Sequence, residues 1–111
     1  MPTFTVDTGE LDGGVRVIFS GDLDLSTAKQ AEQAIEEAER SASLIVIDLR
    51  RLSFMDSTGL RVIVSADKRA KRSGRRAVIV QGPSAVRRVF EITRLGERLE
   101  IVDTPDEIEP E

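Results

Sequence analysis

The feature that most constrains the fold is the apolar run at residues 44–49, Leu-Ile-Val-Ile-Asp-Leu. It is short, almost unbroken and rich in β-branched residues, which is typical of a strand covered on both faces of a sheet. Residues 77–80, Ala-Val-Ile-Val, have the same character. Between the two runs lies an amphipathic helical pattern that begins after Asp56 and ends at Gly74. A strand, a crossover helix and a second strand predict parallel pairing.

The rest of the chain extends this pattern. Residues 3–6 and 15–19 alternate in polarity around a turn signal at residues 12–14, which predicts an N-terminal β-hairpin. A helix is expected from Thr27, which has capping-box spacing to Gln30, to about Arg40. Another is expected from Pro83 to a stop at Gly96, with Val86, Val89, Phe90 and Thr93 facing inward, and a last strand at residues 99–102. We predict an α/β fold: one mixed sheet with an antiparallel hairpin at its edge, later strands parallel, packed by three to four helices.

Composition excludes several classes of function. A chain of 111 residues forms one core, and it has neither cysteine nor histidine, so thiolate nucleophiles, zinc–thiolate sites and a Ser-His-Asp triad are excluded. We therefore expect no enzymatic activity, no cofactor and no metal site. The net charge of −4 and the absence of tyrosine and tryptophan argue against nucleic-acid binding.

Hydropathy bears on where the protein acts. No apolar run approaches the roughly 20 residues of a membrane-spanning helix, and residues 1–4 lack the character of a signal peptide. We expect a cytoplasmic protein that does not enter a membrane. Its small apolar surface predicts a monomer when free.

The best candidate site is the strand-to-helix junction. Asp56, Ser57 and Thr58 are predicted at a helix N-terminus, where unpaired amides and the helix dipole stabilise polar or anionic groups, and Gly59 allows close approach. One interpretation is that Asp56 or Ser57 serves only as the helix cap. Three polar residues after the exposed-looking pair Phe54-Met55 exceed what one cap requires, so a surface role remains open. A phosphate on Ser57 would be received by the helix amides and dipole.

Other charged groups have two readings. Asp22 and Asp24 flank Leu23, so in an extended segment both carboxylates lie on one side and could meet a cationic partner or only solvate a loop. Two carboxylates alone make a poor divalent-cation site. Asp48 ends the buried run and is expected to accept hydrogen bonds from nearby amides. A basic cluster either complements the helix dipole or docks an acidic partner. It comprises Lys68, Arg69, Lys71, Arg72, Arg75 and Arg76.

Three segments together resemble those of a known family. They are residues 21–24 before the first helix, residues 47–49 followed by residues 54–60, and residues 89–95 near the end. In this order they resemble bacterial STAS-domain anti-sigma factor antagonists over almost the whole chain. The most specific part is Asp-Ser-Thr-Gly-Leu at residues 56–60. The resemblance implies a STAS domain at residues 1–103 followed by an acidic tail at residues 104–111.

The resemblance also implies a mechanism of partner switching. Ser57 would be the residue phosphorylated by an anti-sigma factor that is a serine kinase, and Asp56, Thr58 and Gly59 would shape the contact surface. Asp22 and Asp24 match the loop beside it. Unphosphorylated protein would bind the anti-sigma factor and free the sigma factor, and a metal-dependent serine phosphatase would reset Ser57. The alternative is a STAS scaffold or transport-complex subunit that binds a constant partner without switching.

Overall fold

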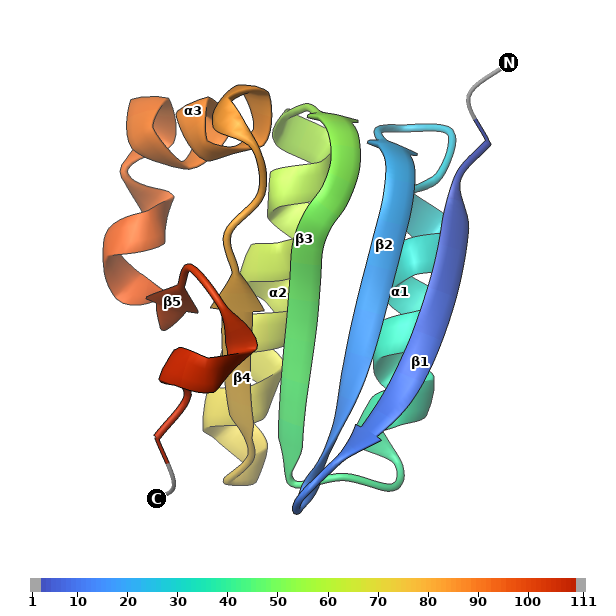
Figure 1. Cartoon of the computed structure of the whole chain (residues 1–111), viewed down its shortest axis with the longest axis vertical. Coiled ribbons are helices and arrows are strands. Elements are labelled where there is room, and N and C mark those ends of the chain that lie inside the picture. Colours follow the sequence, from blue (N-terminus) through green and yellow to red (C-terminus); the bar gives the residue numbers. More distant parts are fainter. Residues whose placement is uncertain (1–2, 110–111) are drawn as a thin grey trace.

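The computed structural model describes residues 3–109, so Met1, Pro2 and the last two residues of the predicted tail, Pro110 and Glu111, lie outside the described part. Within that part, five strands form one sheet with three α-helices and two short 3-10 helices (Figure 1). The elements are β1 (Thr5–Leu11), β2 (Gly14–Leu23), α1 (Ala28–Glu39), β3 (Leu44–Met55), α2 (Ser57–Ser73), β4 (Arg76–Val80), α3 (Ser84–Thr93), η1 (Leu95–Arg98), β5 (Ile101–Val102) and η2 (Pro105–Glu107).

The sheet has the predicted mixed topology. Its order is β1-β2-β3-β4-β5, with β1 antiparallel to β2 and every later pair parallel. The hairpin turn contains Gly13 at φ +78°, a conformation that glycine adopts readily. Several strand bounds differ from prediction: β1 and β2 extend to Leu11 and Leu23, β3 continues past residue 49, and β5 begins only at Ile101. β3 is longer because its pairing with β2 resumes, after a bulge, as far as Met55.

The main core lies between the sheet and helices α1 and α2, which share one of its faces (Figure 1). The small buried residues of α1, such as Ala31 and Ala38, let this helix pack closely on the sheet, as its sequence indicates. Most of the large buried side chains come from the strands and from α2, and α1 and α3 add Ile35 and Phe90. They include Val17, Phe19, Ile45, Ile47, Leu49, Leu60 and Ile63.

Three predicted details of the helices are wrong. The capping box does not form at α1, because the Thr27 hydroxyl instead accepts from the Asp24 amide and donates to the Asp22 carbonyl oxygen. The third helix stops before Gly96: α3 ends at Thr93, and Arg94 takes the left-handed conformation at φ +59°. Thr93 is exposed rather than inward, since its hydroxyl donates to the Val89 carbonyl oxygen within the last turn.

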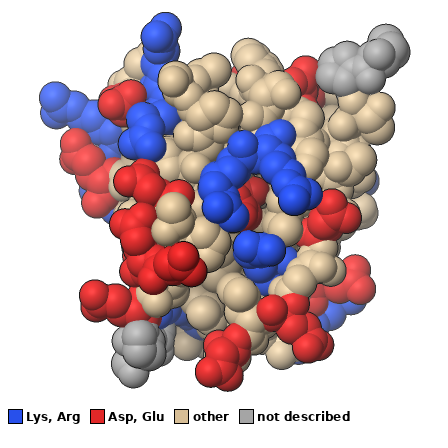
Figure 2. All heavy atoms as spheres, viewed as in Figure 1, with Lys and Arg blue, Asp and Glu red and all other residues tan. Residues whose placement is uncertain are grey.

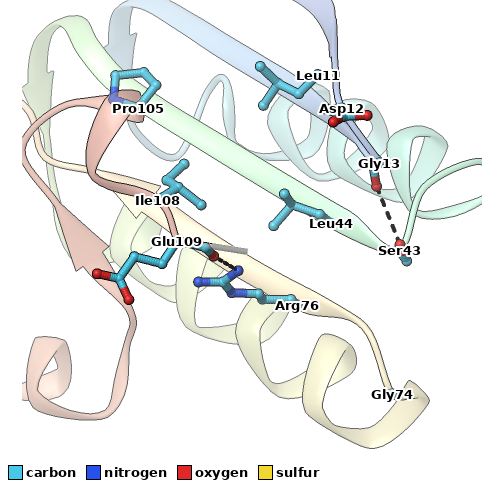
Figure 3. Close-up of a pocket in the computed structure, with 10 residues that line it drawn as sticks. All are labelled: Leu11, Asp12, Gly13, Ser43, Leu44, Gly74, Arg76, Pro105, Ile108 and Glu109. Atoms are coloured by element: carbon cyan, nitrogen blue, oxygen red, sulfur yellow. Dashed lines mark hydrogen bonds between the residues drawn. The ribbon is translucent and has the colours of Figure 1, made fainter. Parts of the chain in front are cut away.

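The second face of the sheet is covered without an α-helix along its middle (Figure 1). The C-terminal segment folds beside β4, where Pro105 and Ile108 face Leu11 and Leu44 across an open hollow of about 500 Å³ (Figure 3). Arg76 at the rim of this hollow donates to the Glu109 carbonyl oxygen. The first half of β3, at residues 45–49, is therefore buried on both faces as predicted, although α1 and α2 cover only one of them. In the second half, Arg50, Arg51, Ser53 and Phe54 are exposed.

Asp48 is a buried carboxylate on this second face, with 2% of its side chain exposed. It accepts from the Arg50 amide at 3.1 Å, as expected, and from Arg50 Nη2 at 2.7 Å, while Arg16 Nη1 lies 3.9 Å away. Burial by itself raises the pKa of Asp48, but the hydrogen bonds from Arg50 and the charges of Arg50 and Arg16 outweigh it. The net effect is a lowered pKa, so the carboxylate form is stabilised by the fold.

We predict that Asp48→Asn lowers the free energy of unfolding at neutral pH by about 1–3 kcal/mol, because it removes a charged, buried acceptor. A depressed carboxyl pKa contributes stability above the unfolded value near 3.9 and loses it as the pH falls through the folded value. Denaturant unfolding should therefore show the wild type and the variant converging below about pH 4.

Asp7→Asn is the matched control for this prediction. Asp7 pairs with Arg51 at 3.9 Å, and both side chains are 65% exposed. Exposed pairs contribute about 0–1 kcal/mol, so this variant should remain close to wild type at every pH. A cost for Asp48→Asn no larger than that for Asp7→Asn would contradict the structural role of Asp48.

Candidate functional site

Asp56 caps α2. Its backbone is extended, and its carboxylate Oδ1 accepts from the Thr58 amide at 2.9 Å and from the Gly59 amide at 3.1 Å. Its carbonyl oxygen accepts from the Leu60 amide. The cap function expected of this segment therefore belongs to Asp56. Ser57 follows as the first residue of the helix, and it is exposed.

Gly59 brings the segment before α1 next to Ser57. A Cβ at Gly59 would lie 2.7 Å from the Leu23 carbonyl oxygen and 2.7 Å from Met55 Cγ, so only glycine fits between the end of β2 and α2. The Asp56 amide also donates to the Leu23 carbonyl oxygen. This hydrogen bond and the close approach of Gly59 hold the N-terminus of α2 against Leu23, which lies between Asp22 and Asp24.

Asp22 and Asp24 do lie at the Ser57 edge of the sheet, but in different settings. Asp22 belongs to β2 and pairs with Phe54 across the strands. The Asp24 carboxylate accepts from the Ser26 hydroxyl at 2.7 Å and from the Ser26 amide at 3.0 Å, and these hydrogen bonds lower its pKa. Both aspartates are half-exposed, but the Asp24 carboxylate is engaged within its own loop, which leaves Asp22 as the carboxylate of the pair that faces a partner.

Apolar side chains complete this edge. Leu25 is 79% exposed in the loop after β2, and Phe54 is 46% exposed near the end of β3. Sequence reasoning singled out Phe54 as exposed but was wrong about Met55, which is 2% exposed and packs in the core. It did not select Leu25, although a lone leucine between an aspartate and a serine was a usable signal. We refer to Asp22, Leu25, Phe54, Ser57 and Thr58 as the Ser57 surface.

One electrostatic expectation changes. The amides of Thr58 and Gly59 were expected to receive a phosphate on Ser57, but both already donate to Asp56. A phosphate on Ser57 would sit beside an ionised carboxylate and would have to displace it to reach those amides. Phosphorylation would therefore add negative charge to a surface whose nearest helix amides already donate to Asp56.

The basic cluster is mostly paired within the chain. Lys71 contacts Asp67 at 2.9 Å, Arg69 contacts Glu39 at 3.1 Å, and Arg76 contacts Glu100. Lys71 also donates to the Arg98 carbonyl oxygen, and Arg75 to the Ser73 hydroxyl. These contacts favour the structural reading of the cluster over a docking role.

Residues 3–109 offer neither a metal site nor a membrane-spanning helix. They contain no group of three or more acidic side chains placed to hold a metal ion. Nor does any helix in this part of the chain have the length and apolarity required to cross a membrane.

Together, the mixed sheet and the capped helix after β3 define the class of protein as an α/β domain with an exposed serine at a strand-to-helix junction. The family model of the STAS domain matches residues 6–108, and the chain belongs to this family. The anti-sigma-B factor antagonist of Listeria monocytogenes is 32% identical over 103 residues, which cover 92% of this chain and 87% of that protein.

Solved structures agree with this assignment. The crystal structure of an anti-sigma factor antagonist from Mycobacterium paratuberculosis has a TM-score of 0.81 at 30% identity, covering 94% of this chain and 89% of that one. The Bacillus cell fate determinant SpoIIAA, solved in a phosphorylated form, shares the fold with a TM-score of 0.69 at 23% identity over 93% of this chain and 95% of that one. The predicted family and fold are confirmed.

We predict that Asp56→Ala lowers the free energy of unfolding by about 0.5–2 kcal/mol, because the Thr58 and Gly59 amides lose their acceptor. Asp56→Asn keeps an oxygen at the same position and should retain most of the stability. Urea unfolding of both variants measures the difference. Equal losses in the two would show that the carboxylate charge, rather than the cap hydrogen bonds, is what matters.

We also predict that Gly59→Val lowers the free energy of unfolding by about 1–3 kcal/mol or more, since the new side chain overlaps the Leu23 carbonyl oxygen. Gly9→Val in edge strand β1 is the control, because a Cβ there meets nothing within 4 Å. Thermal unfolding monitored by circular dichroism compares the two. A Gly59 variant as stable as the Gly9 variant would contradict the close approach.

Proposed function

We propose that this protein is an anti-sigma factor antagonist that is switched off by phosphorylation of Ser57. Unphosphorylated, it binds an anti-sigma factor that is also a serine kinase, and the sigma factor is released. The observation that carries the proposal is the exposed position of Ser57 as the first residue of α2, beside the β2–α1 loop. Relatives named as antagonists of anti-sigma factors support it.

The chemistry of the switch is a reversible phosphoryl transfer. The Ser57 oxygen takes the γ-phosphoryl group of ATP within the kinase, ADP leaves, and the hydroxyl proton passes to a base of the kinase. A metal-dependent serine phosphatase then hydrolyses the phosphoserine to serine and inorganic phosphate. This protein supplies the acceptor and the contact surface but catalyses nothing itself, and we place the cycle in the cytoplasm.

The effect of phosphorylation follows from the Ser57 surface. A phosphate carries a charge of about −1.5 to −2 at neutral pH. It would stand next to Asp56, whose carboxylate occupies the nearest amides, and among the exposed apolar side chains of Leu25 and Phe54. A partner that covers Leu25 and Phe54 would have to desolvate the dianion as well, which is costly. Binding is therefore lost through local charge, without refolding.

Residue roles in the proposal follow from position. Ser57 is the phosphoacceptor, and Thr58 continues the contact surface along the first turn of α2, whereas Gly59 is buried and shapes that surface only by letting α2 approach the end of β2. Asp22, half-exposed beside Phe54, is the carboxylate available to a cationic group of the partner. Asp24 and Asp56 act by positioning, since their carboxylates hold the loop and the helix start. The acidic tail from residue 104, whose boundary with the domain stays a prediction, takes no part.

The first test is the intact mass of the purified protein after incubation with ATP and the anti-sigma factor kinases of its own cell. We expect the gain of one phosphate in the wild type and in Thr58→Ala, and no gain in Ser57→Ala. Failure of every kinase to modify the folded wild type would favour a constant-partner scaffold or transport-complex subunit.

The second test is binding to the kinase identified in this way, measured by calorimetry. Ser57→Ala should bind like unphosphorylated wild type whether or not ATP is present. Ser57→Asp should bind at least about tenfold more weakly, because a desolvated charge at the interface costs more than 1 kcal/mol. Equal affinities of the two variants would overturn the switch.

A further inference from the structure

The second face of the sheet, opposite α1 and α2, carries three arginines that are not part of the Ser57 surface. Arg16 extends from β2, and Arg50 and Arg51 extend from β3; we call these three residues the arginine cluster. With Ile18 and Asp48 they line a shallow hollow of about 290 Å³. Figure 2 shows basic side chains gathered near the middle of this face, in front of β2 and β3.

A β-bulge creates the cluster. The β2–β3 register passes from Ile18 opposite Asp48 to Ser20 opposite Arg51, so that two residues of β3 oppose Phe19 alone. Side chains normally alternate between the faces of a strand, which would send successive arginines to opposite sides. The extra residue changes this alternation, and Arg50 and Arg51 both reach the same hollow.

Two of these arginines are only loosely held within the chain. Asp48 binds Arg50 closely, with Nη2 at 2.7 Å from the carboxylate, whereas Arg16 Nη1 lies 3.9 Å from Asp48 and Arg51 Nη1 lies 3.9 Å from Asp7. The Arg51–Asp7 pair is exposed on both sides, and exposed ion pairs of this length contribute little to stability. Arg51 can therefore accept another carboxylate at low cost, and the partly exposed Arg16 can do so while it stays beside Asp48. A guanidinium group binds carboxylates in a two-point geometry.

The chain's own acidic C-terminal segment is held by basic residues outside the arginine cluster. Asp103 pairs with Arg87 at 3.0 Å at one side of the segment. The hydrogen bond and charge of Asp48 raise the pKa of Arg50, and the negative charge of Asp106 contributes to the same shift. The segment lies over the β4 side of the face and leaves Arg16 and Arg51 partly exposed (Figure 1).

We propose that the arginine cluster is a second docking surface, which binds an acidic segment of a partner protein through Arg16 and Arg51. Charge complementarity selects the occupant, since the hollow presents guanidinium groups around a single, already neutralised carboxylate. The surface lies along the middle of the sheet, whereas Ser57 lies beyond the end of β3. Binding there is independent of the phosphorylation state of Ser57, so both surfaces can be occupied together.

The test is a titration with a polyglutamate peptide at low ionic strength, followed by NMR amide chemical shifts of the full chain. We expect shifts around Arg16 and Arg51 that are lost at about 0.5 M salt, where exposed charges are screened. Arg51→Glu should weaken binding at least about tenfold, because like charges at an interface repel. Arg72→Glu, an exposed change of the same type on α2, should bind like wild type, and so should Ser57→Asp.

Several results would overturn the proposal. These are an absence of shifts, shifts confined to residues 68–76, equal weakening by Arg51→Glu and Arg72→Glu, or equally tight binding of single-stranded oligothymidylate to the same residues. Melting temperatures control for folding, and substitution of the exposed Arg51 should leave the melting temperature close to that of the wild type. Because Ser57→Asp is included, failure here and failure of the phosphorylation switch can be told apart.

Discussion

The parallel pairing of β2 with β3 is the interaction on which the rest of the structure depends. It places residues 21–23 beside residues 52–55, although α1 separates them in the chain. Because the carboxyl ends of parallel strands meet at one edge of a sheet, the loop before α1 and the start of α2 emerge side by side. Gly59 then closes the junction by letting α2 approach the Leu23 carbonyl oxygen. The Ser57 surface exists only because these contacts form together.

The two faces of the sheet are stabilised differently. One is closed by apolar packing with α1 and α2, which is non-directional and tolerates similar side chains. The other depends along β2 and β3 on one buried carboxylate, Asp48, and on the guanidinium groups that neutralise it. Such a polar arrangement is directional and fails when one partner is removed. It also leaves charged groups facing outward, which protects an exposed sheet face from association through apolar contacts.

Capping by Asp56 separates helix stability from the state of Ser57. Since Asp56 supplies the acceptor for the first amides of α2, Ser57 can carry a hydroxyl or a phosphate while the helix start remains satisfied. A switch of this kind changes the charge of a surface and leaves the core untouched. That suits a domain whose sheet and helices share one apolar core.

The sequence by itself determined the order of elements, the mixed sheet and the position of Ser57 at a helix start, because hydrophobic periodicity and turn residues act locally. It did not determine how far β3 runs, that Met55 is buried, or that Thr27 bonds to the Asp22 carbonyl oxygen, since each depends on a neighbouring strand or loop. The bulge that brings Arg50 and Arg51 to one face likewise has no local signal. Only the tertiary structure decided these features, because register and burial are set by contacts between segments far apart in the chain.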